Sequence, residues 1–239
     1  MEGFDLRTIP VGTRFKIGDA LLELTQIGKE CHSHCAIYKV MGDCIMPREG
    51  VFTVVLEGGT VKAGDEVELI EADPARPFTA AWITLSDKGA AGEREDKSGP
   101  LIGEILTEAG YDVVEGILIP DEPAMLKREL MRLADQRQVN VIFTTGGTGF
   151  AQRDRTPEAT AEVCERMTPG IAEAIRAYSM TKTPTAMLSR ATAGIRRETL
   201  IINLPGSPKA VMECLEFLLH PLEHGLEIML GRTGECARQ

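Results

Sequence analysis

The chain has 239 residues, enough for a small domain followed by a medium one. Hydrophobic residues make up 43% of it and charged residues 26%, and the net charge of −10 argues against nucleic acid or an anionic membrane as partner. No apolar stretch approaches the roughly 20 residues of a membrane span, and the start lacks the features of a signal peptide, so we expect a cytoplasmic location.

Residues 1–72 are a series of short β-like runs separated by glycine turns. The expected strands cover residues 13–17, 20–26, 50–56 and 66–70. This spacing predicts a small β-barrel-like or sandwich domain without long helices. Residues 73–77 combine proline and charge, which is typical of a linker, and a second domain is expected at residues 78–239.

From residue 78 onward, strands alternate with amphipathic helices, a pattern typical of an α/β fold whose mostly parallel sheet is covered on both faces. The expected strands are residues 78–85, 113–119, 139–145 and 200–204. Helices are expected from Ser98 as N-cap to Gly110, from Pro123, from Thr156, near residues 171–178, and after Ser207.

Each expected strand of this second domain ends in an unusual loop. The loops carry Ser86 and Asp87; Asp121; Thr145, Gly146, Gly147, Thr148 and Gly149; and Pro205, Gly206 and Ser207. Because ligands of open parallel sheets bind at the carboxyl ends of the strands, these loops are the candidate site.

The glycine-rich loop at residues 146–149 would let the backbone approach a ligand closely and direct N–H groups toward it. Phosphate is the expected ligand of such a loop. The loop matches neither a Walker loop nor the dinucleotide fingerprint, since Gln152 stands where the last glycine should be. A sharp turn is the alternative interpretation. The Ser207 loop could likewise be a simple helix cap.

Asp121 and Asp154 are the candidate acidic residues, because a phosphoryl or nucleotidyl transfer needs carboxylates to hold a magnesium ion. Each could instead only interact with the dipole of the helix that follows. Arg153 and Arg155 flank Asp154 and could bind phosphate oxygens or form surface ion pairs.

Several motifs in the same order resemble the molybdopterin adenylyltransferase family of molybdenum-cofactor biosynthesis. They are residues 144–149, 153–160, 187–190 and 203–208. The resemblance runs from about residue 78 almost to the C-terminus. It implies a three-layer α/β fold, a homotrimer, and Mg²⁺-dependent transfer of AMP from ATP to the terminal phosphate of molybdopterin, with release of pyrophosphate.

By position, the resemblance implies that Asp121 and Asp154 are the essential acidic residues and tentative Mg²⁺ ligands. It places residues 145–149 in the active site, Ser86 and Asp87 in the first loop, and Gly206 with Ser207 in a cradle for the pterin phosphate. Other molybdenum-cofactor assembly proteins are expected partners. The alternative is a non-catalytic pterin-binding or scaffold protein that kept the fold and lost the reaction.

The N-terminal part resembles the second half of a MOSC domain, a β-rich module named after molybdenum-cofactor sulfurases, through residues 10–14, 23–26 and 43–50 with Cys31. The resemblance implies that Cys31 carries sulfur as a persulfide. Two other interpretations of Cys31, His32, His34, Cys35 and Cys44 stay open: a zinc site, although the spacing fits no standard finger, or buried thiols.

Overall fold

The computed structural model describes residues 5–29, 35–70, 73 and 75–232. The chain divides into two compact units, one of residues 1–76 with 135–138 and one of residues 77–134 with 139–239. In the described part of the chain no helix combines the length and apolarity needed to cross a membrane.

The first unit is built on an antiparallel sheet with the strand order β3-β2-β1-β4. Its elements are η1 (Leu6–Thr8), β1 (Arg14–Ile17), β2 (Ala20–Ile27), α1 (Ala36–Met41), α2 (Met46–Glu49), β3 (Val51–Glu57) and β4 (Val67–Ile70). Phe15, Ala20 and Leu24 are its buried apolar side chains. The described strands form an open sheet with β3 and β4 at its edges, so the expected barrel closure is not observed among them.

The second unit is a six-stranded sheet in the order β6-β5-β7-β10-β9-β8. Its strands are β5 (Thr79–Leu85), β6 (Asp112–Ile119), β7 (Val141–Thr145), β8 (Arg166–Met167), β9 (Ala193–Arg196) and β10 (Thr199–Leu204). The first four strands of that order run parallel, whereas β9 and β8 pair antiparallel at one edge. The mostly parallel sheet predicted from the sequence is confirmed.

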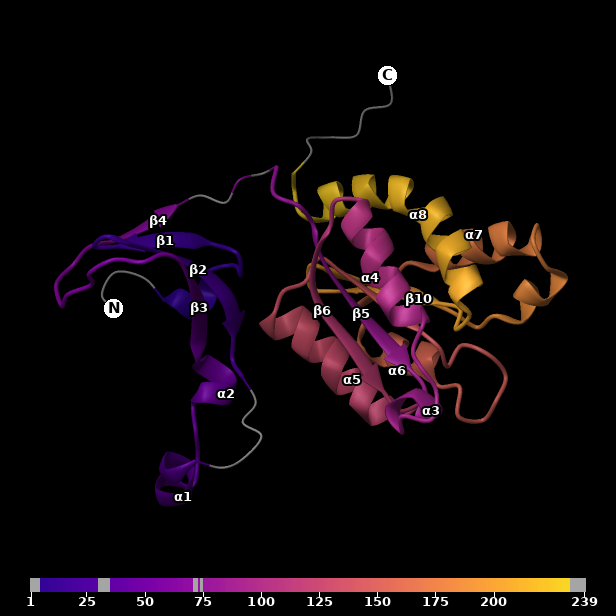
Figure 1. Ribbon diagram of the computed structural model, residues 1–239, viewed down its shortest axis with the longest axis horizontal. Coiled ribbons are helices and arrows are strands. Elements are labelled where there is room, and N and C mark those ends of the chain that lie inside the picture. Colours follow the sequence, from indigo (N-terminus) through magenta and orange to yellow (C-terminus); the bar gives the residue numbers. More distant parts are fainter. Residues whose placement is uncertain (1–4, 30–34, 71–72, 74, 233–239) are drawn as a thin grey trace. The chain divides into compact units, whose positions relative to one another are not determined.

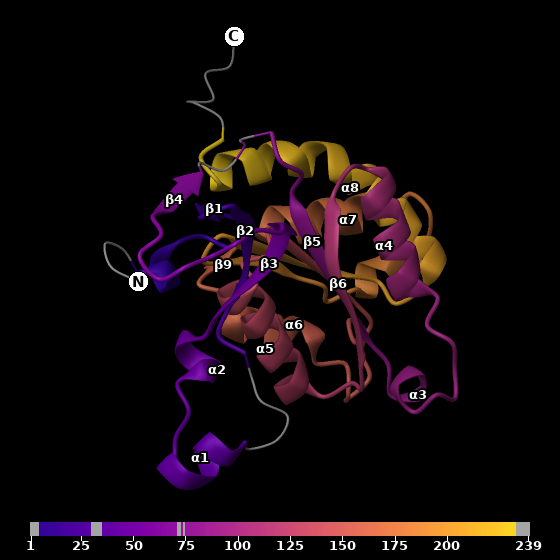
Figure 2. The ribbon, with the colours of Figure 1, turned by 60° about the vertical axis from the view of Figure 1, so that its left-hand side comes forward.

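Helices cover both faces of this sheet (Figure 1). The helical segments from residue 87 onward are α3 (Asp87–Ala90), α4 (Ser98–Glu108), α5 (Pro123–Met131), η2 (Arg132–Gln136), α6 (Thr156–Val163), α7 (Pro169–Met180), η3 (Pro184–Leu188) and α8 (Pro208–Met229). Both views place α5 and α6 together on one face and α4, α7 and α8 on the other (Figure 2).

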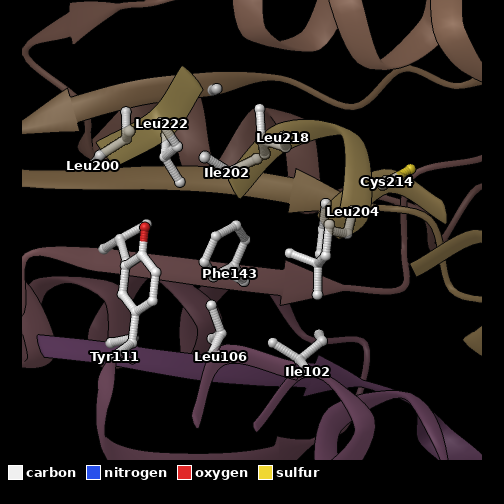
Figure 3. Packing of buried hydrophobic residues seen from close by; sticks show 14 of the residues in the cluster. Ile102, Leu106, Tyr111, Phe143, Leu200, Ile202, Leu204, Cys214, Leu218 and Leu222 are labelled. Atoms are coloured by element: carbon white, nitrogen blue, oxygen red, sulfur yellow. The ribbon is translucent and has the colours of Figure 1, made fainter. Parts of the chain in front are cut away.

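Two apolar clusters hold the layers together. Ile102 and Leu106 of α4 pack with α8 side chains against Phe143 and Ile202, which are neighbours on β7 and β10 (Figure 3). On the other face, buried leucines of α5 and apolar residues of α6 pack against the same strands. Burial of both faces explains why β7 and β10 are continuous apolar runs, as expected for central parallel strands. The rigid sheet thus fixes where its strand ends and their loops lie.

Candidate functional site

A cavity of about 870 Å³ lies at the carboxyl ends of the central strands of the second unit. Its lining comes from the loops after β5, β6, β7 and β10 and from the start of α4. The lining residues are Thr84, Leu85, Ser86, Gly89, Arg94, Glu95, Asp96, Lys97, Ser98, Asp121, Thr145, Gly146, Gly147, Asp154, Gly206, Ser207 and Pro208. Segments far apart in the sequence therefore meet where an open parallel sheet normally binds its ligand.

Asp87 and Asp121 join the ends of β5 and β6 through two reciprocal hydrogen bonds. The backbone N–H of Asp87 donates to Asp121 Oδ2, and the backbone N–H of Asp121 donates to Asp87 Oδ1, both at 3.0 Å. Arg153 donates from Nε to Asp87 Oδ2 at 2.8 Å and from Nη2 to Asp87 Oδ1 at 2.9 Å. These bonds lower the pKa of Asp87. Arg153 therefore forms an ion pair in this structure, the second of the two roles considered for it.

The carboxyl group of Asp121 lies in the cavity among other negative charges. Burial raises its pKa above the ordinary value, and the carboxylates of Asp87 and Asp154 add to this effect. Asp121 Oδ1 lies 3.5 Å from the point that a Cβ on Gly147 would occupy, which places it beside the glycine loop. A cation bound here would relieve the repulsion among the carboxylates.

The loop after β7 requires glycine at its first two positions. Gly146 has φ +100° and Gly147 has φ +63°, and a Cβ would lie 2.3 Å from Leu85 O at the first and 2.3 Å from Thr156 Oγ1 at the second. The Thr156 hydroxyl also donates to Gly146 O at 3.0 Å, tying the loop to the start of α6. The two glycines thus form the sharp turn that was the alternative interpretation, packed against the end of β5 and the start of α6.

Asp154 closes the same loop. Its Oδ2 accepts a hydrogen bond from the backbone N–H of Ala151 at 2.9 Å, and its own N–H donates to Ala151 O at 3.0 Å. In the described part of the chain, no hydrogen bond reaches Asp154 Oδ1. Asp121 and Asp154, 33 positions apart in the sequence, line one cavity.

The loop after β10 contributes a helix N-terminus. Ser207 Oγ caps α8 by accepting from the Ala210 N–H at 3.2 Å, as the sequence predicted. Gly206 O accepts from Ser98 Oγ at 2.9 Å, and Pro205 O accepts from Thr145 Oγ1 at 2.7 Å. These bonds join the starts of α4 and α8 to the end of β7, so both helix ends lie beside the cavity.

Ser98 is not the N-cap that the sequence predicted for α4. Ser98 is the first helical residue and Lys97 the N-cap residue, and the side chain of the preceding Asp96 accepts from the N–H groups of Ser98 and Gly99 at 3.0 and 3.1 Å. The Ser98 hydroxyl is therefore available to bond the neighbouring loop. Asp96 Oδ2 and the Thr84 hydroxyl are buried without a hydrogen-bond partner in the described residues, so a polar ligand at this end would satisfy them.

Arg94, Lys97 and Asp96 are cavity residues that the sequence analysis missed. They belong to the polar segment between β5 and α4, whose path no periodicity reveals. One sequence feature could have indicated the role of Asp96. It stands two residues before the Ser-Gly-Pro sequence that starts the helix, where an aspartate side chain can accept from the first helical N–H groups. Among the described lining residues four are acidic and only two basic, so a phosphorylated ligand would bind here together with a cation.

Some candidate residues lie beside the cavity rather than in its lining. Asp87 is held by Arg153, Pro205 accepts the Thr145 bond, and the carbonyls of Thr148 and Gly149 accept bonds from Arg190. Their contribution is to hold the loops. The remaining candidates on these loops line the cavity.

Cys31, His32 and His34 lie outside the described residues. Of the same motif, Cys35 is exposed and Cys44 is partly exposed. Among described side chains no three His, Cys, Asp or Glu residues gather as a complete metal site. The buried-thiol interpretation is therefore wrong for Cys35.

The loops at the strand ends of this doubly wound sheet bring a tight glycine turn, the N-terminus of α8 and two carboxylates to one cavity. Open α/β sheets bind their ligands at this position. Residues 81–224 match the family described as a probable molybdopterin binding domain. The chain belongs to that family.

Curated relatives and solved structures agree with this assignment. The molybdopterin adenylyltransferases of Helicobacter pylori (strain ATCC 700392 / 26695) and Escherichia coli (strain K12) are 42% identical over 151 residues and 43% identical over 136 residues. These matches cover 62% and 56% of this chain, and 86% and 70% of the respective relative. MoaB of Thermus thermophilus, described as a molybdopterin biosynthesis enzyme, is similar with TM-score 0.62 and 48% identity over 64% of this chain and 97% of that chain.

Proposed function

We propose that this protein is a molybdopterin adenylyltransferase, which transfers AMP from ATP to the terminal phosphate of molybdopterin and releases pyrophosphate. The observation that carries the proposal is the meeting of Asp121, Asp154 and the Gly146–Gly147 turn in one cavity with the α8 N-terminus. Relatives named as molybdopterin adenylyltransferases match more than half of the chain, which supports the proposal.

The reaction needs no protein nucleophile. A terminal phosphate oxygen of molybdopterin attacks the α-phosphorus of ATP, the new P–O bond forms, and the bond from that phosphorus to the bridging oxygen breaks as pyrophosphate leaves. The N–H groups of Gly147 and of the α8 start, with the Ser207 loop, would hold phosphate oxygens. Catalysis then consists of positioning two phosphates and neutralising their charge.

Mg²⁺ fits the donors present. Asp121 and Asp154 would hold it, since both carboxylates line the cavity, where burial and the neighbouring carboxylates of Asp87 and Asp154 raise the pKa of Asp121. Magnesium commonly binds through one or two carboxylates, with substrate phosphates and water completing its shell. When bound, it would offset the charge of the polyphosphate.

The test is an assay with molybdopterin, ATP and Mg²⁺ that detects adenylylated pterin. We expect Asp121→Asn and Asp154→Asn each to lower kcat by about 100-fold or more, because each removes a carboxylate that would hold Mg²⁺ beside the transferring phosphates. Asp112→Asn, an exposed aspartate on β6 outside the cavity, is the matched control and should retain activity. Pterin binding without AMP transfer by the wild type would instead select the non-catalytic scaffold.

We further propose a cytoplasmic homotrimer that works with other cofactor-assembly proteins, and a MOSC-like first unit that carries sulfur on Cys31. The support is the sequence resemblance. Light scattering tests the trimer. Cyanide-releasable sulfur, measured after exposure to a cysteine desulfurase, should be lost in Cys31→Ser and kept in Cys35→Ser.

A further inference from the structure

Arg190 holds the loop that carries Asp154, although it lies 36 positions further along the chain. Its Nε donates to Gly149 O at 2.7 Å, and its Nη2 donates to Asp154 O. Its Nη1 pairs with the Glu158 carboxylate on α6, and its backbone N–H donates to Thr148 O at 3.0 Å. One residue therefore fixes both ends of the loop and the first turn of the helix that follows.

Apart from Arg190, the loop between Gly149 and Asp154 is held by the side chain of Arg153, which donates hydrogen bonds to Asp87, Asp121 O and Glu122. Residues 150–153 are exposed, and Phe150 has 71% of its surface accessible, so burial contributes little to their order. The Asp154 carboxylate depends on this loop, because its Oδ2 is held by the N–H of Ala151. Displacement of the backbone at Gly149 or Asp154 would therefore move the carboxylate.

Arg190 does not line the cavity that contains Asp121. It lies with Glu158 and Asp154 on a neighbouring depression, behind the loop. An effect of Arg190 on the reaction would therefore pass through the position of Asp154. The planar guanidinium suits this task, since it directs donors at two carbonyls and a carboxylate at once, whereas a lysine ammonium lacks that fixed fork.

We propose that Arg190 is a positioning residue for the adenylyl transfer, which sets the orientation of the Asp154 carboxylate by fixing the carbonyls of Gly149 and Asp154. This inference rests on the proposed function. Displacement of a catalytic group by about 1 Å can cost on the order of 100-fold in rate. We expect Arg190→Ala to lower kcat by about that factor with the KM for molybdopterin unchanged, and Arg190→Lys to lower it by about tenfold.

The experiment measures kcat and KM of the full chain for wild type, Arg190→Lys and Arg190→Ala, with and without millimolar guanidinium. Guanidinium should restore part of the kcat of Arg190→Ala, which a misfolded variant would not show. Arg132→Lys is the matched control, because Arg132 also makes three side-chain hydrogen bonds but to Glu115 and Glu129, away from the cavity. It should keep wild-type kcat.

Hydrogen exchange gives a readout that does not depend on catalysis. The Ala151 amide, bonded to Asp154 Oδ2, should exchange at least about tenfold faster in Arg190→Lys, while the β7 amides stay protected. Three results would each overturn the positioning role. They are a wild-type kcat in Arg190→Lys, unchanged exchange at Ala151, and a raised KM with kcat unchanged. If the wild type were inactive but its Ala151 exchange still depended on Arg190, the proposed function would be refuted. The role of Arg190 in holding the loop would still stand.

Discussion

The carboxylate of Glu158 lies between two arginines. Arg190 Nη1 is hydrogen-bonded to its Oε1, and Arg155 Nε is 4.0 Å from its Oε2. Burial works to raise the pKa of Glu158, but the hydrogen bond from Arg190 and the charges of both arginines outweigh it, so the pKa is lowered from 4.5. The charged form of Glu158 thus stabilises the folded state.

We therefore expect a pH-dependent difference in stability between wild type and Glu158→Gln. Because the folded pKa is lowered, the stabilisation is present above the unfolded pKa and is lost as the pH falls through the folded pKa. At pH 7 it should be at most about 1 kcal/mol, since the side chain is 38% exposed and solvent screens the pair. Urea unfolding at descending pH measures it. The exposed Glu104→Gln should show no such trend, and a difference that grows on acidification would contradict the assignment.

The described cysteines differ in environment. Burial raises the pKa of the Cys164 thiol to about 11, and burial also raises that of Cys214. Cys35 is exposed, and its pKa is lowered by backbone N–H groups of Tyr38 and Ile37 at the start of α1. Thiolates, not thiols, react with alkylating agents.

Iodoacetamide at pH 8 should consequently modify Cys35 well before Cys164 or Cys214. Peptide mass spectrometry of the folded protein, followed over time, measures the three rates separately. The urea-unfolded protein is the control, in which the rates should converge. Early labelling of Cys164 in the folded state would be incompatible with its burial.

At the residue scale, a site residue could be predicted where it stands next to a recognisable strand or helix start. Asp121 follows a recognisable apolar strand, and Asp154 stands next to a recognisable helix start, so topology alone brings them to one edge of the sheet. Arg94 and Asp96 lie in a polar loop whose course is set by tertiary hydrogen bonds. The anchoring role of Arg190 was equally hidden, since it depends on a contact made across 36 positions of sequence.

Between α4 and β6, three glycines make room for Trp82, the single tryptophan of the chain. A Cβ on Gly116 would lie 2.1 Å from its Cζ2, and Cβ atoms on Gly99 and Gly103 would also meet the indole at 2.3 and 2.9 Å. The ring thus packs against glycines of both the helix and the strand. Element packing here depends on the absence of side chains.

Gly116→Ala should therefore destabilise the second unit by roughly 1–3 kcal/mol, because the indole must move into packed surroundings. Tryptophan fluorescence during urea unfolding reports both the shift of the ring and the loss of stability. Gly170→Ala is the control, since its Cβ would enter open space at the exposed start of α7. Adding Trp82→Leu should relieve part of the Gly116→Ala penalty, and a strictly additive double variant would disprove the steric cause.

At the element scale, apolar periodicity predicted the four parallel strands of the second unit to within about two residues. It missed β9 and β8, because Ala193–Arg196 has a small and polar composition and Arg166–Met167 is only two residues long. Their strand character comes from pairing with β10 and with each other. The strand order was also not predictable from any single segment, since it arises from how the crossovers pack.

At the scale of the whole molecule, everything assigned to the proposed reaction lies in the second unit. The cavity lining falls between Thr84 and Pro208, and the family match covers residues 81–224. This unit also has its own two apolar clusters, one on each face of its sheet. A domain with its own core can fold independently.

We accordingly expect a protein of residues 77–239 to fold and to transfer AMP to molybdopterin with kcat and KM near those of the full chain. Circular dichroism and the adenylylation assay, run on both proteins side by side, measure this. Asp154→Asn in the shortened protein should lower kcat by about 100-fold or more, the same loss that we expect in the full chain. If the shortened protein folds and binds molybdopterin but fails to transfer AMP, residues 1–76 must contribute to the reaction itself, and the first unit would then need a role beyond the sulfur carriage proposed for Cys31.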